Sequence, residues 1–543
     1  MSLQFITGNS GNGKTKYLFN RIVKEAKANP RDNYLVIVPE QFTMQTQKDL
    51  CMAHPRGGIM NIDVLSFGRL AHRVFEETGK ERQPILDDEG KNLVLRKIAG
   101  NYEDELTVLK GNLKKQGYIS EVKSVISEFT QYGIDFEQLD SFMEGLNPES
   151  YLYYKLKDIR KVYEGFEDYL RDKYITKEEL LDVLSQTVPE AKMLKDSVIA
   201  MDGFTGFTPV QNRLIGELLK VCDKIMLTVE IDRREDPFVY KHPYQLFALS
   251  KQMVTSLTEV AQEVRVEIDE PVWLCKNPSY RFKENPEMAF LEEELFRYSR
   301  RKYSGEKMRS ISLHEVHTPQ EEAQYVAEEI RRLVREEGYR YREIAVIASD
   351  LSTYADALEK ACDRYEIPVF MDHKKSILLN SFVEYLRSLL VMVEQNYTYE
   401  SVFRYLRTSL CGFTRDEVDR LENYCLALDL KGFKKWDQVW VRKTPMTTKE
   451  ELEELNHLRM RFVEKLTPLH TVLKKRKKTV KEITLAVYEY LFRRRSRSSL
   501  QNWSRNSRKM ENWHWRRNMH RFIVLFWNYL INSLNFWGRK RFL

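Results

Sequence analysis

Short apolar runs alternate with amphipathic segments along the first part of the chain. An apolar run covers residues 3–6, and residues 17–23 then carry apolar side chains at helical spacing. Two further apolar runs, at residues 35–38 and 62–65, are each followed by another segment with helical periodicity. Strands that alternate with helices in this way predict an α/β fold with a parallel sheet.

The alternation is interrupted and then resumes. Residues 85–190 form a long, charge-rich stretch with helical periodicity. A buried-strand pattern then ends at Asp202, and the segment CDKIMLTVEID predicts one more strand. We therefore expect one parallel sheet with a helical domain inserted into it.

Composition limits the class of protein. A chain of 543 residues is expected to form roughly three or four domains. No apolar run approaches the ~20 residues that cross a bilayer, and the N-terminal residues lack a signal-peptide pattern, so we expect a cytoplasmic protein without membrane contact. The six cysteines are scattered without a C-x-x-C pair and predict reduced core thiols. The net charge of +7 is small beside 87 basic and 80 acidic residues, which indicates a mostly balanced surface.

The segment GNSGNGKT has the G-x-x-x-x-G-K-[ST] pattern of a phosphate-binding loop between a strand and a helix. Its glycines let backbone N–H groups face phosphate oxygens, its lysine reaches the outer phosphates of ATP, and its threonine is a ligand for Mg²⁺. The motif alone is shared by kinases, motors and passive nucleotide binders. The expected nucleotide-binding residues are Gly8, Asn9, Ser10, Gly11, Asn12, Gly13, Lys14 and Thr15.

A family resemblance appears in four further segments. VPEQFTMQTQKDL, VLSFGRLAHRVFEE, MDGFTGFTPVQ and YREIAVIASDLSTYADALEKACDRYEIPVFMD together resemble AddB, the second of the two chains of the AddAB helicase-nuclease, up to about residue 490. The resemblance implies a superfamily 1 helicase-like fold, with two RecA-like domains that each carry a helical insertion. The implied boundaries are a first RecA-like domain at 1–84 and 191–300, its insertion at 85–190, a second RecA-like domain at 301–375, its insertion at 376–492, and an anomalous tail at 493–543.

The resemblance also implies a function. In that family AddA is the motor, and AddB recognises the Chi sequence in single-stranded DNA while the complex processes broken DNA ends for recombinational repair. We therefore expect a heterodimer with an AddA-like motor/nuclease subunit, assembled on DNA ends. The family's C-terminal nuclease domain and the cysteine ligands of its 4Fe–4S cluster are not found in this sequence, so we expect no nuclease activity from this chain.

Three departures from active helicases weaken the motor. Gly203 stands after Asp202 where a water-activating glutamate is required, the residues before Gly8 are too few for an adenine-reading segment, and Ser349 with Asp350 follow a strand expected at 344–348 where an arginine is usual. We expect ATP to bind and hydrolysis to be slow or absent. Asp202 is either a Mg²⁺ ligand or a helix cap or turn residue.

DNA-contacting candidates follow the strand ends, where ligands bind in open α/β sheets. Aromatic rings, arginine and amide side chains are the groups that hold single-stranded DNA. For Phe67, packing beneath its own helix is favoured over a base contact. For Gln41 and Thr43, N-capping of the following helix is the alternative. The candidates are Gln41, Thr43, Phe67, Arg69 and Phe207.

Two basic stretches remain. Residues 474–478 are suited either to a phosphate backbone or to a solvated helix face. The tail from Arg493 combines arginines with five tryptophans, which suits a stacking surface for nucleic acid. We expect instead that the tail is translated in a shifted frame and that the chain is a truncated AddB-like protein. An active ATP-driven translocase and a small-molecule kinase are the alternative functions.

Overall fold

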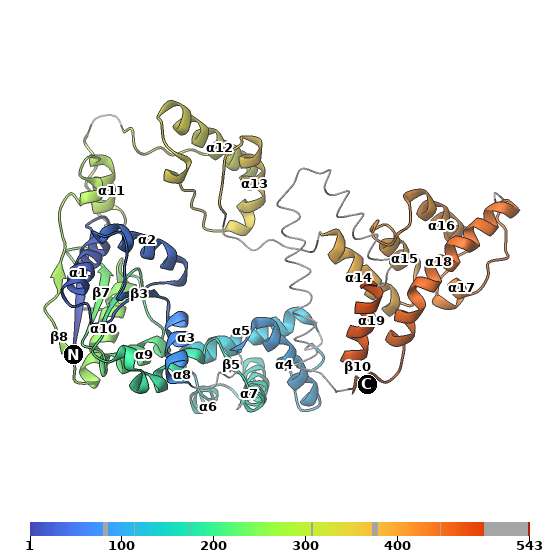
Figure 1. Cartoon of the computed structure of the whole chain (residues 1–543), viewed down its shortest axis with the longest axis horizontal. Coiled ribbons are helices and arrows are strands. Elements are labelled where there is room, and N and C mark those ends of the chain that lie inside the picture. Colours follow the sequence, from blue (N-terminus) through green and yellow to red (C-terminus); the bar gives the residue numbers. More distant parts are fainter. Residues whose placement is uncertain are drawn as a thin grey trace. The chain divides into compact units, whose positions relative to one another are not determined.

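The computed structural model describes residues 1–79, 85–112, 115–171, 173–305, 308–371, 378, 380–445, 447–492 and 541–542. The chain divides into two compact units, Met1–Leu313 and His314–Leu543. Figure 1 shows the elements of both, and each unit is described by itself. The first unit ends at Leu313, and the predicted start of the second RecA-like domain at residue 301 stays a prediction.

The first unit contains a wholly parallel sheet, as the sequence predicted. Its strand order is β3-β2-β6-β7-β1-β8, and β9 also pairs with β1. Gly8 of β1 lies opposite Glu230 of β7, and Ile37 of β2 lies between Leu65 of β3 and Met201 of β6. The strands are β1 (Ser2–Gly8), β2 (Tyr34–Ile37), β3 (Ile62–Leu65), β6 (Val198–Met201), β7 (Lys224–Glu230), β8 (Glu267–Ile268) and β9 (Val272–Trp273).

Alternation along the strands sends side chains into two cores, one on each face of the sheet. Tyr34 and Val36 of β2 pack with helices α1 (Lys14–Ala28) and α2 (Thr43–Ala53). Leu35 and Ile37 point to the other face. That face is covered by α3 (Phe67–Thr78), α8 (Leu180–Thr187), α9 (Pro209–Leu219) and α10 (Ala248–Glu263).

The stretch between β3 and β6 is helical, as predicted. A buried carboxylate organises it, because Asp158 is 3% exposed and accepts hydrogen bonds from the backbone N–H groups of residues 107–109. Its elements are β4 (Ile85–Leu86), α4 (Asp88–Asn101), α5 (Gln116–Tyr132), α6 (Phe136–Glu144), α7 (Tyr151–Leu170), β5 (Ile175–Thr176), α8, η2 (Val188–Glu190) and η3 (Lys192–Leu194). The first unit also contains η1 (Glu40–Phe42), η4 (Tyr280–Phe282) and α11 (Pro286–Glu294).

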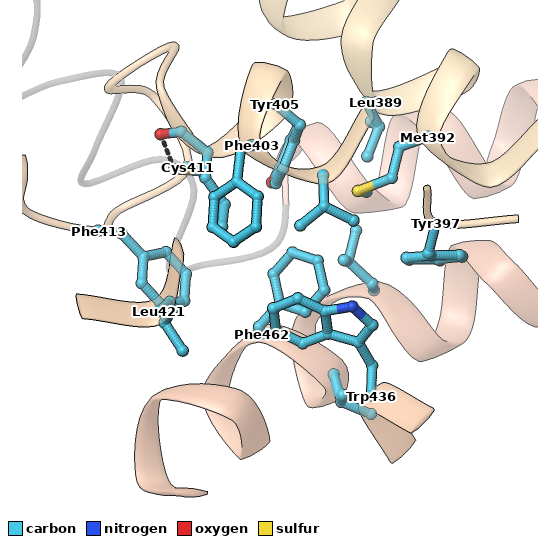
Figure 2. Packing of buried hydrophobic residues seen from close by; sticks show 14 of the residues in the cluster. Leu389, Met392, Tyr397, Phe403, Tyr405, Cys411, Phe413, Leu421, Trp436 and Phe462 are labelled. Carbon is cyan, nitrogen blue, oxygen red and sulfur yellow. Dashed lines mark hydrogen bonds between the residues drawn. The ribbon is translucent and has the colours of Figure 1, made fainter. Parts of the chain in front are cut away.

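The second unit is largely helical where it is described. Its larger core contains the buried side chains of Trp436, Tyr405 and Phe462 (Figure 2). The ring centroids of Trp436 and Phe462 lie 4.5 Å apart. Its elements are α12 (Pro319–Glu336), η5 (Tyr341–Glu343), α13 (Leu351–Arg364), α14 (Ser381–Glu394), α15 (Tyr399–Leu406), α16 (Arg415–Ala427), α17 (Phe433–Asp437), α18 (Lys449–Leu473), β10 (Lys478–Thr479), α19 (Val480–Phe492) and β11 (Arg541–Phe542). β10 pairs antiparallel with β11.

One predicted strand is not formed. Residues 344–348 lie between η5 and α13 without strand pairing, although their sequence is strongly apolar. Ile344 packs on the small core of α12 and α13, whereas the side chain of Ile347 is 94% exposed. A strand requires a hydrogen-bonded neighbour, and no described strand lies beside this segment.

Several smaller predictions have different outcomes. Four cysteines are buried as expected, but Cys51 and Cys275 are only partly buried. The basic run at 474–478 follows α18 as a turn and ends at the first residue of β10, so the helix-face alternative is wrong. No described helix is long and apolar enough to cross a membrane. The predicted frame-shifted tail lies outside the described residues, apart from Arg541 and Phe542.

Candidate functional site

The segment between β1 and α1, which we call the phosphate loop after its sequence motif, makes a sharp turn. Gly11 and Gly13 have φ angles of 77° and 80°, a region that favours glycine, and Gly13 caps the N-terminus of α1. Ser10 is half-buried, and Asn12 is 2% exposed. The chain therefore turns sharply at the carboxyl edge of the sheet and presents the first turn of α1 there, an arrangement suited to phosphate.

Lys14 lies among charged groups at this turn. Its ammonium donates a hydrogen bond to the backbone oxygen of Asn9 at 3.1 Å. Burial lowers the pKa of Lys14, while the carboxylates of Glu230 and Asp202 act in the opposite direction and Arg281 adds to the lowering. A phosphate group would offer the ammonium a charged acceptor in place of the neutral Asn9 carbonyl.

Asp202 faces the loop from the end of β6. Its Oδ1 accepts hydrogen bonds from the hydroxyl of Thr15 at 3.1 Å and from the hydroxyl of Thr228 at 2.6 Å. A hydroxyl and a carboxylate are the hard oxygen donors that Mg²⁺ prefers, so Thr15 and Asp202 fit a magnesium ion. The structure thus brings together two residues that are 187 positions apart in the chain.

Gly203 follows with a φ angle of 77°, and a Cβ at this position would lie 3.7 Å from Pro39 and 3.9 Å from Phe42. There is room for a side chain, but an L-residue would be strained by the backbone conformation. The backbone conformation at this position therefore favours glycine over the glutamate that an active helicase requires.

A second segment covers the phosphate loop, and the sequence motif did not reveal it. We call residues 274–282 the strap. The backbone N–H of Lys276 donates to Oδ1 of Asn12 at 2.9 Å, and the N–H of Arg281 donates to the oxygen of Gly11 at 3.2 Å. The strap thereby brings two cationic residues to the loop.

Helix α11, which follows the strap, also contacts the loop. The side-chain amide of Asn9 donates to Oε1 of Glu292 at 2.7 Å. The residues of the strap and of α11 that contact the phosphate loop lie more than 260 positions after it in the chain. No local sequence pattern therefore predicted the strap or the contact with Glu292.

The DNA candidates lie at the same edge of the sheet, in the segments that follow the neighbouring strands β6, β2 and β3. Gln41, in η1 after β2, is exposed, and so is Arg69 in the first turn of α3. The side chain of Arg69 has no ion pair with a described residue. Thr43 is different, because it is 4% exposed and its hydroxyl donates to the oxygen of Glu40. It is neither an exposed contact nor the N-cap of α2, which is Phe42.

The predicted aromatic candidates pack together. Phe67 is 7% exposed, and its ring lies 5.6 Å from Phe204 and 6.3 Å from Phe207. The packing alternative therefore describes Phe67, whereas Phe207 remains partly exposed. One exposed ring at this edge is that of Phe42, at 47%, which the sequence pattern did not single out. Its position directly after Gln41, in the same segment after β2, is the sequence feature that indicates it as a candidate.

A carboxylate was also missed. Glu230 ends β7 with an exposed side chain, and β7 lies between the strand of the phosphate loop and the strand that ends before Asp202. The strand order places Glu230 beside the phosphate loop, where its charge acts on Lys14. The strand pattern alone ended this segment at Asp232 and gave no reason to select Glu230.

Two family models match the chain. The model described as "ADDB, N-terminal" matches residues 5–292, and the model described as "UvrD-like helicase C-terminal domain" matches residues 281–538. The first match begins within β1 and covers the other strands of the sheet, the phosphate loop and the strap.

Several curated proteins that are similar to the chain are named as the B component of an ATP-dependent helicase/deoxyribonuclease. The protein from Lachnoclostridium phytofermentans is 39% identical over 494 residues, which is 90% of this chain and 43% of that protein. One from Clostridium perfringens is 34% identical over 507 residues, with the same two shares. One from Acetivibrio thermocellus is 31% identical over 500 residues, again 90% of this chain and 43% of that protein. The chain spans less than half the length of these relatives.

Proposed function

Because the chain belongs to the AddB family, we propose that it is the nucleotide- and DNA-binding part of the AddB component of an ATP-dependent helicase/deoxyribonuclease. One observation carries the proposal: a single sheet edge holds both a phosphate loop facing Asp202 and an exposed set of amide, aromatic and arginine side chains. In this proposal the partner is an AddA-like motor subunit. The complex processes double-strand DNA ends for recombinational repair.

The nucleotide half of the site is formed by β1, β7 and β6. ATP phosphates bind the backbone of the loop and Lys14, and Thr15 with Asp202 hold Mg²⁺. The ion would neutralise charge between the outer phosphates. Lys276 and Arg281 lie on the strap above the loop and add positive charge close to the phosphates.

The DNA half is formed by β6, β2 and β3. Phe42 offers a ring for stacking, Arg69 offers charge, and Gln41 offers an amide that bonds to base edges. The packed rings of Phe67, Phe204 and Phe207 join the segment after β6 to the start of α3, which carries Arg69. We propose that this surface takes part in recognition of a Chi-type sequence.

ATP binding without fast hydrolysis is part of the proposal. Water attack on the outer phosphate requires a carboxylate that orients and deprotonates the water, and Gly203 supplies none. In this account the nucleotide stabilises the sheet edge and does not drive movement along DNA.

An active ATP-driven translocase is the second candidate, and Glu230 is the observation that favours it. Its exposed carboxylate ends the strand between the phosphate loop and Asp202, where an attacking water would be oriented.

Steady-state ATP hydrolysis, with and without single-stranded DNA, separates the two functions. A slow-turnover protein binds ATP in a Lys14-dependent manner and hydrolyses it far below the rate of helicases, which is ~10 s⁻¹ or faster. If turnover reaches that range and Glu230→Gln abolishes it while ATP still binds, the translocase is the correct function. If ATP stabilises the Lys14→Ala variant as it does the parent protein, the phosphate loop has no role and both proposals fail.

A further inference from the structure

The first two turns of α7 expose a cluster of tyrosines at the surface of the helical insertion. The side chain of Tyr151 is 68% exposed, that of Leu152 is 47% exposed and that of Tyr154 is 36% exposed. The rings of Tyr153 and Tyr154 lie 5.7 Å apart at 86°, and the Tyr118 hydroxyl of α5 interacts with Tyr151. Exposed rings that gather at one end of a helix indicate a binding surface.

The helix pattern explains why these rings are exposed. The buried stripe of α7 runs at helical spacing from Ile159 to Leu170. The same spacing continues back through the half-buried Leu156 to Leu152, which is exposed. The apolar stripe is therefore longer than the core that covers it.

Two lysines follow the rings on α7, while the exposed Glu149 precedes the helix. Lys155 and Lys157 are exposed, and neither forms an ion pair with a residue in the described ranges. The later cations of α7 differ, since Arg160 pairs with Asp140 and Lys161 pairs with Glu105.

The nearest carboxylate on the helix does not offset these lysines at the surface. Asp158 is buried and accepts hydrogen bonds from backbone N–H groups of residues 107–109. Its charge is therefore directed into the insertion. The exposed part of α7 carries tyrosine rings with uncompensated lysines among them.

We propose that this surface, the α7 tip formed by Tyr118, Tyr151, Tyr153, Tyr154, Lys155 and Lys157, binds single-stranded nucleic acid. Tyrosine rings stack on bases without sequence preference, and the lysines neutralise backbone phosphates. The lysines alone would also complement an acidic protein surface, but the exposed flat rings beside them match unstacked bases and select the nucleic acid. The inference goes beyond the sheet edge and does not depend on it.

Photocrosslinking locates the contact directly. The full chain is irradiated with an oligo-dT that carries 5-bromodeoxyuridine, and the crosslinked peptides are identified by mass spectrometry. We expect a crosslink within residues 151–157 that persists in Arg69→Ala, since that variant changes only the sheet edge. If crosslinks occur only outside α5 and α7, the proposal is overturned while the sheet-edge site is untouched.

Two double variants test the chemistry by fluorescence anisotropy. Tyr151→Ala with Tyr154→Ala is expected to weaken binding about tenfold, within the range for losing stacked bases. Lys155→Gln with Lys157→Gln is expected to flatten the slope of log K against log salt by about 1.4, for two phosphates on a single strand. Lys177→Gln, an exposed lysine of the same insertion, serves as the control.

Circular dichroism establishes that each variant is folded. Unchanged affinity and slope in both folded double variants would overturn the proposal. Variants that alter binding of a protein partner but not of the oligonucleotide would do the same and would assign the surface to that partner.

Discussion

The hydroxyl of Thr15 donates a hydrogen bond to Oδ1 of Asp202, and the two atoms are 3.1 Å apart. Thr15 lies in the first turn of α1, and Asp202 follows β6, two strands away from β1 in the sheet. Thr228 of the intervening strand β7 donates to the same carboxylate oxygen at 2.6 Å. Three elements thus fix one carboxylate beside the phosphate loop, and this contact gives a direct test of metal binding.

Asp202→Asn is expected to weaken binding of ATP in the presence of Mg²⁺ by about tenfold, because the amide loses the charge that attracts the ion while its oxygen still accepts from Thr228. Isothermal titration with and without EDTA measures the effect. The variant and the parent protein should bind metal-free ATP equally. Equal affinity for the magnesium complex would show that Asp202 is a structural turn residue.

The close approach of the strap is tested at Gly11. A Cβ at this position would lie 2.6 Å from Cβ of Arg281 and 2.9 Å from the hydroxyl of Ser279, on a backbone with φ of 77°. Gly11→Ala is therefore expected to lower stability by about 1–3 kcal/mol and to impair ATP binding. Urea unfolding measures the first effect. Gly57→Ala, with φ of 67° and nothing within 4 Å of a Cβ, is the control, and equal behaviour of both variants would contradict the strap contact.

A pH dependence is expected from Glu167 in α7. Burial raises the pKa of Glu167 to about 7 from its ordinary value of 4.5, and the nearby carboxylate of Glu179 adds to the shift. The folded chain therefore binds a proton that the unfolded chain releases. The associated stability is fully present below pH 4.5 and is lost as the pH rises through 7.

Glu167→Gln keeps a hydrogen-bond donor and removes this titration. We expect the variant to melt about 2–4 °C above the parent protein at pH 8, for a gain of about 1 kcal/mol. The two proteins should melt together at about pH 5, where the parent carboxyl is protonated in the folded state. Thermal unfolding at both pH values measures this, and a difference that does not change with pH would show that Glu167 is not buried as a protonated acid.

The sheet was predictable because its signals are local. Each apolar run from Leu3 to Val229 is followed by turn residues and then by helical periodicity, and the structure confirms the parallel strands. The phosphate loop was equally local, since its glycines and Lys14 are contiguous. The prediction failed at residues 344–348, where apolar sequence was sufficient to suggest a strand but pairing depends on a neighbour elsewhere in the chain.

The parts of the site that sequence did not reveal depend on distant contacts. Arg281 reaches Gly11 from 270 positions away in the chain, and only the folded strap shows it. Phe42 and Phe67 both follow strands, so their patterns are similar, and burial alone separates the exposed ring from the packed one. The spacing of a motif predicts local backbone geometry, whereas the exposed fraction of a side chain depends on how distant parts of the chain pack around it.

The central claim is that the exposed groups after β2 and β3 bind single-stranded DNA. Arg69 and Arg73 lie one turn apart on α3 and provide a matched pair, because Arg73 forms an ion pair with Asp63 at 3.0 Å while Arg69 has no such partner among the described residues. Replacing either by alanine removes the same charge from the same helix.

Binding of a labelled oligonucleotide to Arg69→Ala and Arg73→Ala, measured across a range of salt concentrations, is the most direct test. The account predicts weaker binding by Arg69→Ala, with a slope of log K against log salt that is flatter by about 0.7, the value for one phosphate on a single strand. Arg73→Ala should behave as the parent protein does. Equal affinities and equal slopes for the two variants would contradict the claim that this edge of the sheet holds DNA.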